Sequence, residues 1–149
     1  MENQEKVKSI GKWISILHRQ AQIYLNRELK PYGLSSSEYI YLVNLGVEDD
    51  GINQKCLSDM IIIDDALTTR VMKNLETKGY IIREKSQIDK RSYNIRLTKK
   101  GIEIQPIILK VLKNWTDIIA EGMNEAERDS IIQKLTVMSH NALKVTQGK

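Results

Sequence analysis

The sequence offers almost no disulfide chemistry, because a single cysteine, Cys56, rules out an intramolecular disulfide framework. Long apolar runs are also missing, since none approaches the roughly 18 residues needed to cross a bilayer. Residues 1–4 are polar and hold no apolar signal-peptide core. We therefore expect a protein of the reducing cytoplasm that does not reside in a membrane.

Motifs of catalysis and metal binding are absent as well. The chain has no Walker loop, no glycine-rich dinucleotide turn and no nucleophile elbow. His18 and His140 lie far apart and have no neighbours at ligand spacing, so no metal site is expected. These absences disfavour an enzyme and predict no cofactor. With 149 residues, 41% of them apolar, and no internal repeat, the chain predicts one compact unit.

Positive charge is concentrated in one part of the chain. The formal net charge of +4 is by itself too common to indicate a partner. Residues 61–100, however, hold ten Lys or Arg against five Asp or Glu, and the remainder is near neutral. This local excess favours an acidic partner for that segment.

The first part of the chain has helical spacing. Apolar residues recur at steps of three and four from about residue 4 to 30, which predicts one long amphipathic helix. Pro31 cannot continue this helix. Ser35 followed by Glu38 predicts a capping box for a second helix that runs to about Leu45.

Two further helices are predicted before residue 78. Asn53 is a good N-cap for a short third helix, and residues 61–63 predict the turn after it. Asp64 or Asp65 is expected to cap a fourth helix. Its apolar face is predicted to carry Leu67, Val71, Met72 and Leu75. Its opposite face carries Ala66, Thr69, Arg70 and Lys73.

A hairpin and two long helices are predicted to complete the chain. Residues 80–83 and 93–97 read as short strands joined by a polar, basic loop. Thr98 is the predicted cap of a helix running to about Glu121, with a bend near Pro106 because proline removes a helical hydrogen bond. A last helix, capped by Asn124, is expected to turn inward Ile131, Ile132, Leu135, Met138 and Leu143.

This order of elements is that of a winged helix-turn-helix, in a fold that is mainly α with a small β wing. We expect a winged lobe at residues 35–97 and a helical dimerisation region formed by residues 1–34 and 98–149. A helix fits the major groove of DNA, and an arginine at a hairpin tip fits the minor groove. The pattern therefore predicts a regulator that binds double-stranded DNA.

The candidate contacts follow from side-chain chemistry. Arg91, at the hairpin tip, has the planar and permanent charge suited to a minor groove. Asp89 is predicted to pair with that guanidinium and hold it ready, the alternative being an exposed ion pair without a role in DNA binding. The major-groove candidates are Ala66, Thr69, Arg70 and Lys73. Phosphate contacts are expected from Lys85, Lys90, Ser36, Asn53 and Gln54, of which the last three are equally well explained as helix caps.

The terminal helices carry more apolar residues than a monomer of this length can cover. They include Ile10, Trp13, Ile14, Ile107, Trp115 and Ile118. A partner chain would bury them, so the sequence predicts a homodimer. Two recognition helices related by a two-fold axis would then read half-sites roughly 34 Å apart.

Several short segments, taken together, resemble the MarR family of bacterial transcriptional regulators over nearly the entire chain. The resemblance implies a homodimer built from the first and last helices that binds a pseudo-palindromic operator. Such proteins usually repress, often until a small phenolic compound or an oxidant releases them. The matching segments are 29–35 (LKPYGLS), 57–60 (LSDM), 69–70 (TR), 75–83 (LETKGYIIR), 89–91 (DKR) and 97–101 (LTKKG).

The resemblance also implies an effector pocket between the dimer helices and the DNA-binding lobe. The reactive cysteine of hydroperoxide-responsive relatives lies in the first helix, whereas Cys56 lies in the third, so we expect a buried structural thiol. The pocket is expected near Trp13, Ile16, Leu17, Tyr39 and Val43, for each of which ordinary core is the plainer alternative.

One departure from the family concerns the start of the recognition helix. Residues 64–67 read Asp-Asp-Ala-Leu, where many relatives have a basic residue followed by Ser or Thr. The two acids weaken the positive field, which leaves open a winged-helix module that binds protein instead of DNA. Salt-sensitive DNA binding separates the two alternatives.

Overall fold

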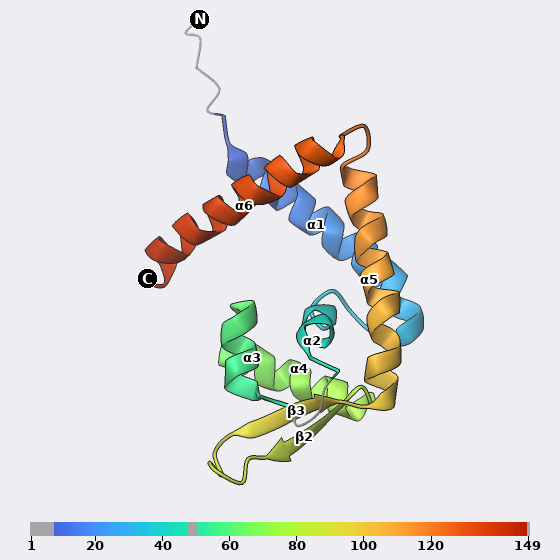
Figure 1. Ribbon diagram of the computed structural model, residues 1–149, viewed down its shortest axis with the longest axis vertical. Coiled ribbons are helices and arrows are strands. Elements are labelled where there is room, and N and C mark those ends of the chain that lie inside the picture. Colours follow the sequence, from blue (N-terminus) through green and yellow to red (C-terminus); the bar gives the residue numbers. More distant parts are fainter. Residues whose placement is uncertain (1–7, 48–50, 149) are drawn as a thin grey trace, which may run out of the picture. The chain divides into compact units, whose positions relative to one another are not determined.

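The computed structural model describes residues 8–47 and 51–148. It confirms a mainly helical fold with a small antiparallel sheet (Figure 1). Within the described residues, no helix combines the length and the apolar character that crossing a membrane requires. The elements are α1 (Ile10–Leu29), η1 (Lys30–Tyr32), α2 (Tyr39–Asn44), β1 (Ile52–Asn53), α3 (Gln54–Ile61), α4 (Asp65–Thr77), β2 (Ile81–Lys85), β3 (Tyr93–Leu97), α5 (Lys99–Ile119) and α6 (Glu125–Thr146).

Helix α1 begins later than the periodicity predicted. Ser9 is its N-cap, and the Ser9 hydroxyl accepts a hydrogen bond from the Lys12 amide. The part of the prediction that covers residues 4–7 lies outside the described residues. At its other end the helix continues into η1. This short 3₁₀ helix ends at its C-cap Gly33, which has a left-handed φ of 69°.

The sheet has one strand more than the sequence predicted. Strands β2 and β3 form the expected hairpin, paired antiparallel from Ile81 opposite Leu97 to Lys85 opposite Tyr93. The additional strand, β1, pairs with the other side of β3, with Ile52 opposite Ile95. In Figure 1 the far end of the β2–β3 hairpin projects beyond the helices next to it as a wing.

One hydrophobic core includes residues from the end of α1, the winged lobe and the first half of α5. The apolar face predicted for the fourth helix is confirmed, with Val71, Met72 and Leu75 buried and Leu67 partly buried. The polar groups inside this core are paired, for example Tyr41 Oη with Thr68 Oγ1 at 3.1 Å. The fully buried side chains include Leu29, Tyr41, Leu42, Leu57, Met72, Leu75, Ile95 and Ile108.

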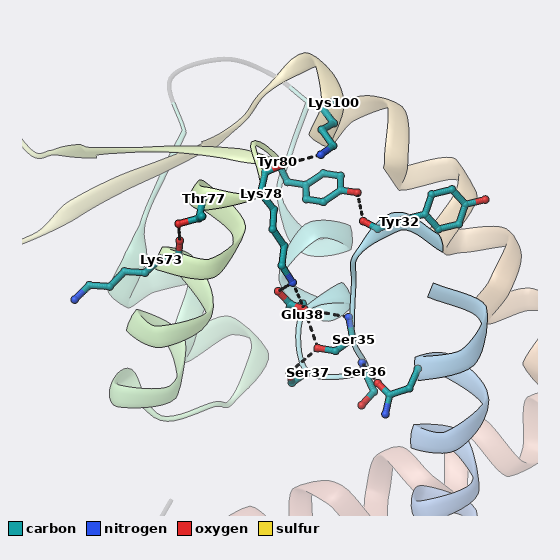
Figure 2. A network of polar contacts seen from close by, with 11 residues as sticks. Tyr32, Ser35, Ser36, Ser37, Glu38, Lys73, Thr77, Lys78, Tyr80 and Lys100 are labelled. Carbon is teal, nitrogen blue, oxygen red and sulfur yellow. Dashed lines mark hydrogen bonds and ion pairs between the residues drawn. The ribbon is translucent and has the colours of Figure 1, made fainter. Parts of the chain in front are cut away.

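A buried carboxylate stands where the second helix was predicted to begin. Glu38 is only 4% exposed, and Lys78 Nζ donates to its two oxygens at 2.9 and 2.7 Å (Figure 2). The Ser35 amide donates to Glu38 Oε1, but the Ser35 hydroxyl donates to the same oxygen rather than capping the helix. The capping-box prediction is thus half right, and α2 starts at Tyr39, after a turn in which the Glu38 and Tyr39 amides donate to the Ser35 carbonyl oxygen.

The same network reaches the start of the wing and of α5. Tyr80 Oη donates to the carbonyl oxygen of Tyr32, and Lys100 Nζ donates to that of Lys78 (Figure 2). Burial raises the pKa of Tyr80, and the negative charge of Glu38 raises it further. A Cβ atom at Gly101 would overlap the carbonyl oxygen of Tyr80, so only glycine allows α5 to begin this close to the wing.

The chain divides into two compact units, one through Lys113 and one from Asn114 to Lys149. The division predicted from the sequence, with a helical region at 1–34 and 98–149, stays a prediction. Helix α5 continues through Pro106 without interruption. In the second unit Asn124 and Glu127 form the predicted capping box of α6.

The inward face predicted for the last helix is not found in the single chain. No residue of α6 is buried, and Ile131, Ile132 and Leu135 are exposed. Met138 and Leu143 are half-buried. The apolar spacing correctly indicated a helix, but a helix face becomes a core only where another element of the same chain covers it.

Candidate nucleic-acid interface

Helix α4 presents a polar face opposite its buried one. Ala66, Arg70 and Lys73 are exposed, and neither Arg70 nor Lys73 forms an ion pair with any residue that the structure describes. Thr69 is half-buried, and its hydroxyl donates to the carbonyl oxygen of Asp65. The helix begins at this place because Asp64 is its N-cap and accepts from the Leu67 amide at 2.7 Å. An arginine and a lysine are therefore displayed from one rigid helix face.

The turn between α3 and α4 lies where the sequence predicted it. Helix α3 ends at Ile61, and Ile62 takes a left-handed φ of 59°, which is rare for a β-branched residue. The Ile63 amide donates to the Ser58 carbonyl oxygen, which closes the turn. The buried Ser58 hydroxyl donates to Asp65 Oδ1 at 2.7 Å and so ties the two helices together.

The tip of the wing is held by its own hydrogen bonds. The Ser86 hydroxyl, almost buried, accepts from the amides of Ile88 and Asp89. Asp89 Oδ1 accepts from the main-chain amide of Arg91 at 3.0 Å. The predicted pairing of the Asp89 carboxylate with the Arg91 guanidinium is therefore wrong, since no such ion pair occurs among the described residues. Asp89 shapes the loop through the backbone, as aspartate often does in tight turns.

The cations of the wing point into solvent. Lys85, Lys90 and Arg91 are exposed, and within the described part of the chain none of them has an ion-pair partner. Ile88, beside them, is 99% exposed. The wing thus carries three cations without an ion-pair partner among the described residues, beside the single loop acid Asp89, on a backbone that is fixed by side-chain hydrogen bonds.

The predicted phosphate ligands at helix starts have partners within the protein. Asn53 caps α3 by accepting from the Lys55 and Cys56 amides. The Ser36 amide donates to Asn26 Oδ1. Gln54 Nε2 donates to Thr69 Oγ1 at 3.0 Å, and Gln54 Oε1 accepts from Arg83 Nε at 2.9 Å.

A recess separates the wing tip from the starts of α3 and α4. Its volume is about 240 Å³. Lys55 stands at this recess between two acids, and the charges of Asp59 first and Asp65 second raise its pKa. The residues that line the recess are Gln54, Lys55, Asp65, Asp89, Arg91, Ser92 and Tyr93. It therefore contains charges of both signs, which agrees with the weaker positive field expected from the acids of this segment.

Two further predictions concerned the burial of Cys56 and the effector pocket. Cys56 is exposed, so the predicted buried thiol is wrong. The inner side of α3 is formed by its neighbours Leu57 and Ser58. The predicted effector pocket stays a prediction; Trp13 and Leu17 are exposed, and the others are half-buried, namely Ile16, Tyr39 and Val43.

Three residues of this surface were not singled out by the sequence. Arg83 is stacked on the Tyr93 ring at 3.5 Å from its centroid, Lys55 lies beside the recess, and Ser86 organises the wing loop. The alternation of the strands places Arg83 and Tyr93 in the wing but gives no sign that they contact each other. Only the strand register, with Arg83 opposite Ile95 and Lys85 opposite Tyr93, brings the two side chains together.

Comparisons with known proteins agree with this architecture. The family model described as transcriptional regulator SarA/Rot matches residues 24–108. The regulator SarZ of Staphylococcus haemolyticus is 31% identical over 116 residues, which cover 76% of each chain.

Two solved structures match nearly the whole chain. A MarR transcriptional regulator from Methanosarcina mazei Go1 is 37% identical, with a TM-score of 0.83 over 92% of this chain and 98% of that one. A putative MarR family regulator from Listeria monocytogenes, solved in complex with a 26mer DNA, is 29% identical, with a TM-score of 0.82 over 96% and 97% of the two chains. The match of more than half of the chain to a family model, together with these structures, shows that the protein belongs to the MarR family of winged-helix transcriptional regulators.

Proposed function

We propose that this protein binds a pseudo-palindromic operator in double-stranded DNA as a homodimer and represses transcription. The observation that carries the proposal is the set of exposed cations on α4 and on the wing. These are Arg70, Lys73, Lys85, Lys90 and Arg91, and they have no ion-pair partner among the described residues. Unpaired cations on two projecting elements suit a polyanion with two grooves.

Each element has a separate task in this proposal. Helix α4 enters the major groove, where Arg70 donates to the edge of a guanine and Ala66 contacts an apolar methyl group. The wing places the Arg91 guanidinium in the narrow and electronegative minor groove. Lys73, Lys85 and Lys90 neutralise phosphates. Ser36, three residues before α2, and Asn53, the N-cap of α3, approach the backbone of the duplex and position the protein without reading its sequence.

The dimer is supported by apolar surface that the single chain leaves open. Trp13 is 62% exposed on α1, and Ile132 is 59% exposed on α6. A second copy of the chain would cover such faces and would present two recognition helices about 34 Å apart to successive major grooves. Release by a small apolar or phenolic effector completes the proposal, with Trp13 and Tyr39 among the residues expected at its pocket.

The first experiment measures binding to duplexes selected by the protein from a random pool. Fluorescence anisotropy should give an affinity that falls steeply with salt, because bound cations displace counterions from the DNA. Arg91→Ala should lower the affinity by about tenfold or more while circular dichroism shows an unchanged fold. Lys144→Ala removes one charge from α6, where no DNA contact is proposed, and should change the affinity by less than about twofold.

A second variant separates phosphate contacts from base contacts. Lys90→Ala should weaken the binding of all duplexes by a similar factor and reduce the salt slope by about one. A loss confined to certain sequences would contradict a phosphate role. If the wild-type protein ignores every duplex even in dilute buffer, DNA binding is refuted, and the alternative of a protein-binding winged helix takes its place.

A further inference from the structure

A continuous set of polar contacts joins the wing to the recognition helix through one residue, Gln54. The Tyr93 ring on β3 stacks on the Arg83 guanidinium of β2 at 3.5 Å. Arg83 Nε donates to Gln54 Oε1 at 2.9 Å, and Gln54 Nε2 donates to Thr69 Oγ1 of α4 at 3.0 Å. Four elements, β3, β2, α3 and α4, each contribute one side chain to this contact chain.

The contact chain leaves its members little freedom. All four side chains are half-buried, and Gln54 uses both its carbonyl oxygen and its amide nitrogen. The Thr69 hydroxyl gives its only hydrogen to the Asp65 carbonyl oxygen, so it can receive Gln54 only as an acceptor. The direction of each of these hydrogen bonds is therefore determined. If the Gln54 amide were flipped, its NH₂ would face the Arg83 N–H donor and its oxygen would face the Thr69 acceptor.

We propose that Gln54 is a positioning residue that holds the wing at a set distance from α4, so that Arg91 and Arg70 meet one duplex in register. This inference rests on the proposed function, since it explains how the two groove contacts are made together. A wing that is held in place before binding loses less conformational freedom when its arginine enters the minor groove. A loosened wing spends part of its time out of reach, and its arginine then adds less to the affinity.

Two other roles for Gln54 give different results in the same experiment. If its amide donates to a phosphate, as the sequence suggested, removing it weakens binding by one factor whether or not Arg91 is present. If it only stabilises the fold, its removal lowers the free energy of unfolding and leaves the contribution of Arg91 unchanged. Positioning alone predicts that the effect of Arg91→Ala depends on the residue at position 54.

The test is a double-mutant cycle on a duplex that the wild-type protein selects from random sequences. Anisotropy titrations compare wild type, Arg91→Ala, Gln54→Met and the double variant. Arg91→Ala should lower the affinity about tenfold in the wild-type background but less than about threefold in Gln54→Met. Methionine matches the length of glutamine and removes both hydrogen bonds.

The matched control is Gln105→Met. Gln105 Nε2 donates to the carbonyl oxygens of Leu42 and Leu45, so this variant also loses two glutamine hydrogen bonds, but away from the wing. In its background Arg91→Ala should keep its effect of about tenfold.

The outcomes separate the two proposals. An equal effect of Arg91→Ala in the wild-type and Gln54→Met backgrounds overturns the positioning role and leaves DNA binding intact. If Arg91→Ala has no effect in the wild-type protein, the wing arginine does not contact DNA, and the positioning role falls together with that part of the proposed function, whereas binding of the selected duplex by the wild type keeps DNA binding itself. Should Gln54→Met fail to fold by circular dichroism, Thr69→Val cuts the other end of the contact chain and takes its place in the same cycle.

Discussion

The winged lobe and helix α6 of the second unit differ in what holds them. In the lobe, side chains distant in sequence are buried against one another, as Tyr41 is with Thr68. In α6 no residue is buried, and the hydroxyls of Thr136, Ser139 and Thr146 donate to carbonyl oxygens four residues earlier in the same helix. Bonds of this kind are local, and the start of α6 is tied to α5 by Arg128, whose Nη1 donates to Asp117 Oδ1 at 2.7 Å. The lobe therefore carries its own tertiary stability, whereas α6 leaves Ile131, Ile132 and Leu135 exposed in the single chain.

The largest effect is expected in the core of the lobe. Leu75 is fully buried on the inner face of α4, so Leu75→Ala removes packed methyl groups and leaves a cavity. The free energy of unfolding should fall by about 2–5 kcal/mol, measured by chemical denaturation. Leu135→Ala, on the open face of α6, is the matched change and should have a much smaller effect at protein concentrations where the wild type sediments as a single chain. Similar losses for both would show that α6 is as tightly packed as the lobe.

The next effect concerns the ion pair between Glu38 and Lys78. Lys78→Met leaves a buried carboxylate with only Ser35 as its partner, which should cost about 1–3 kcal/mol of unfolding free energy. The double variant Glu38→Gln/Lys78→Met should be less destabilised than Lys78→Met alone, because the unpaired buried charge is gone. Equal losses in the single and the double variant would contradict this account. Lys73→Met, at an exposed position of α4, should change stability by less than about 0.5 kcal/mol.

A third change addresses the open face of α6 directly. Ile132→Asp places a charge where the proposed dimer contact lies and should raise the dimer dissociation constant by about tenfold or more, through the cost of burying an unpaired carboxylate. Analytical ultracentrifugation measures the mass as a function of concentration. Gln133→Asp adds the same charge beside it at an already polar position and serves as the control. If the wild-type protein sediments as a single chain at micromolar concentration, the dimer proposal fails.

The smallest effect is expected at Cys56. Because this side chain is exposed on α3, Cys56→Ala should change the free energy of unfolding by less than about 0.5 kcal/mol. Its neighbour Leu57 is fully buried, and Leu57→Ala should cost about 2–5 kcal/mol. Denaturation of the two variants side by side measures the contrast. A loss above about 1 kcal/mol for Cys56→Ala would restore the earlier prediction of a structural thiol.

Most of the helices could be predicted because their signals are local. Helix starts and ends depend on residues within one helical turn, so they can be predicted from the sequence alone. Examples are the N-caps Asn53, Asp64 and Asn124 and the helix-breaking Pro31. Strand β1 was missed because two residues are too short for an alternating pattern. Its existence depends on β3, about forty residues later, which offers it a free edge.

The errors at the candidate site have a common origin. The Asp89 carboxylate can bind either the guanidinium or the backbone amide of Arg91, and the sequence alone does not show which of the two it binds. The loop geometry that Ser86 imposes turns the Arg91 amide toward the carboxylate. Cys56 was predicted to be buried because free cysteines usually are, but the inner face of α3 is formed by Leu57 and by Ser58, which donates to Asp65.

By itself the sequence determined the order of the helices, the position of the helix-turn-helix and the cations that its exposed face and its wing would carry. These depend on the spacing of neighbouring residues and on caps that act within a few positions. Tertiary structure decided which polar side chains bind one another. In the folded chain Gln54 is hydrogen-bonded to Thr69 and Arg83, and Glu38 is paired with Lys78. The reason is physical, since a hydrogen bond of about 3 Å between residues tens of positions apart exists only once the intervening chain has packed.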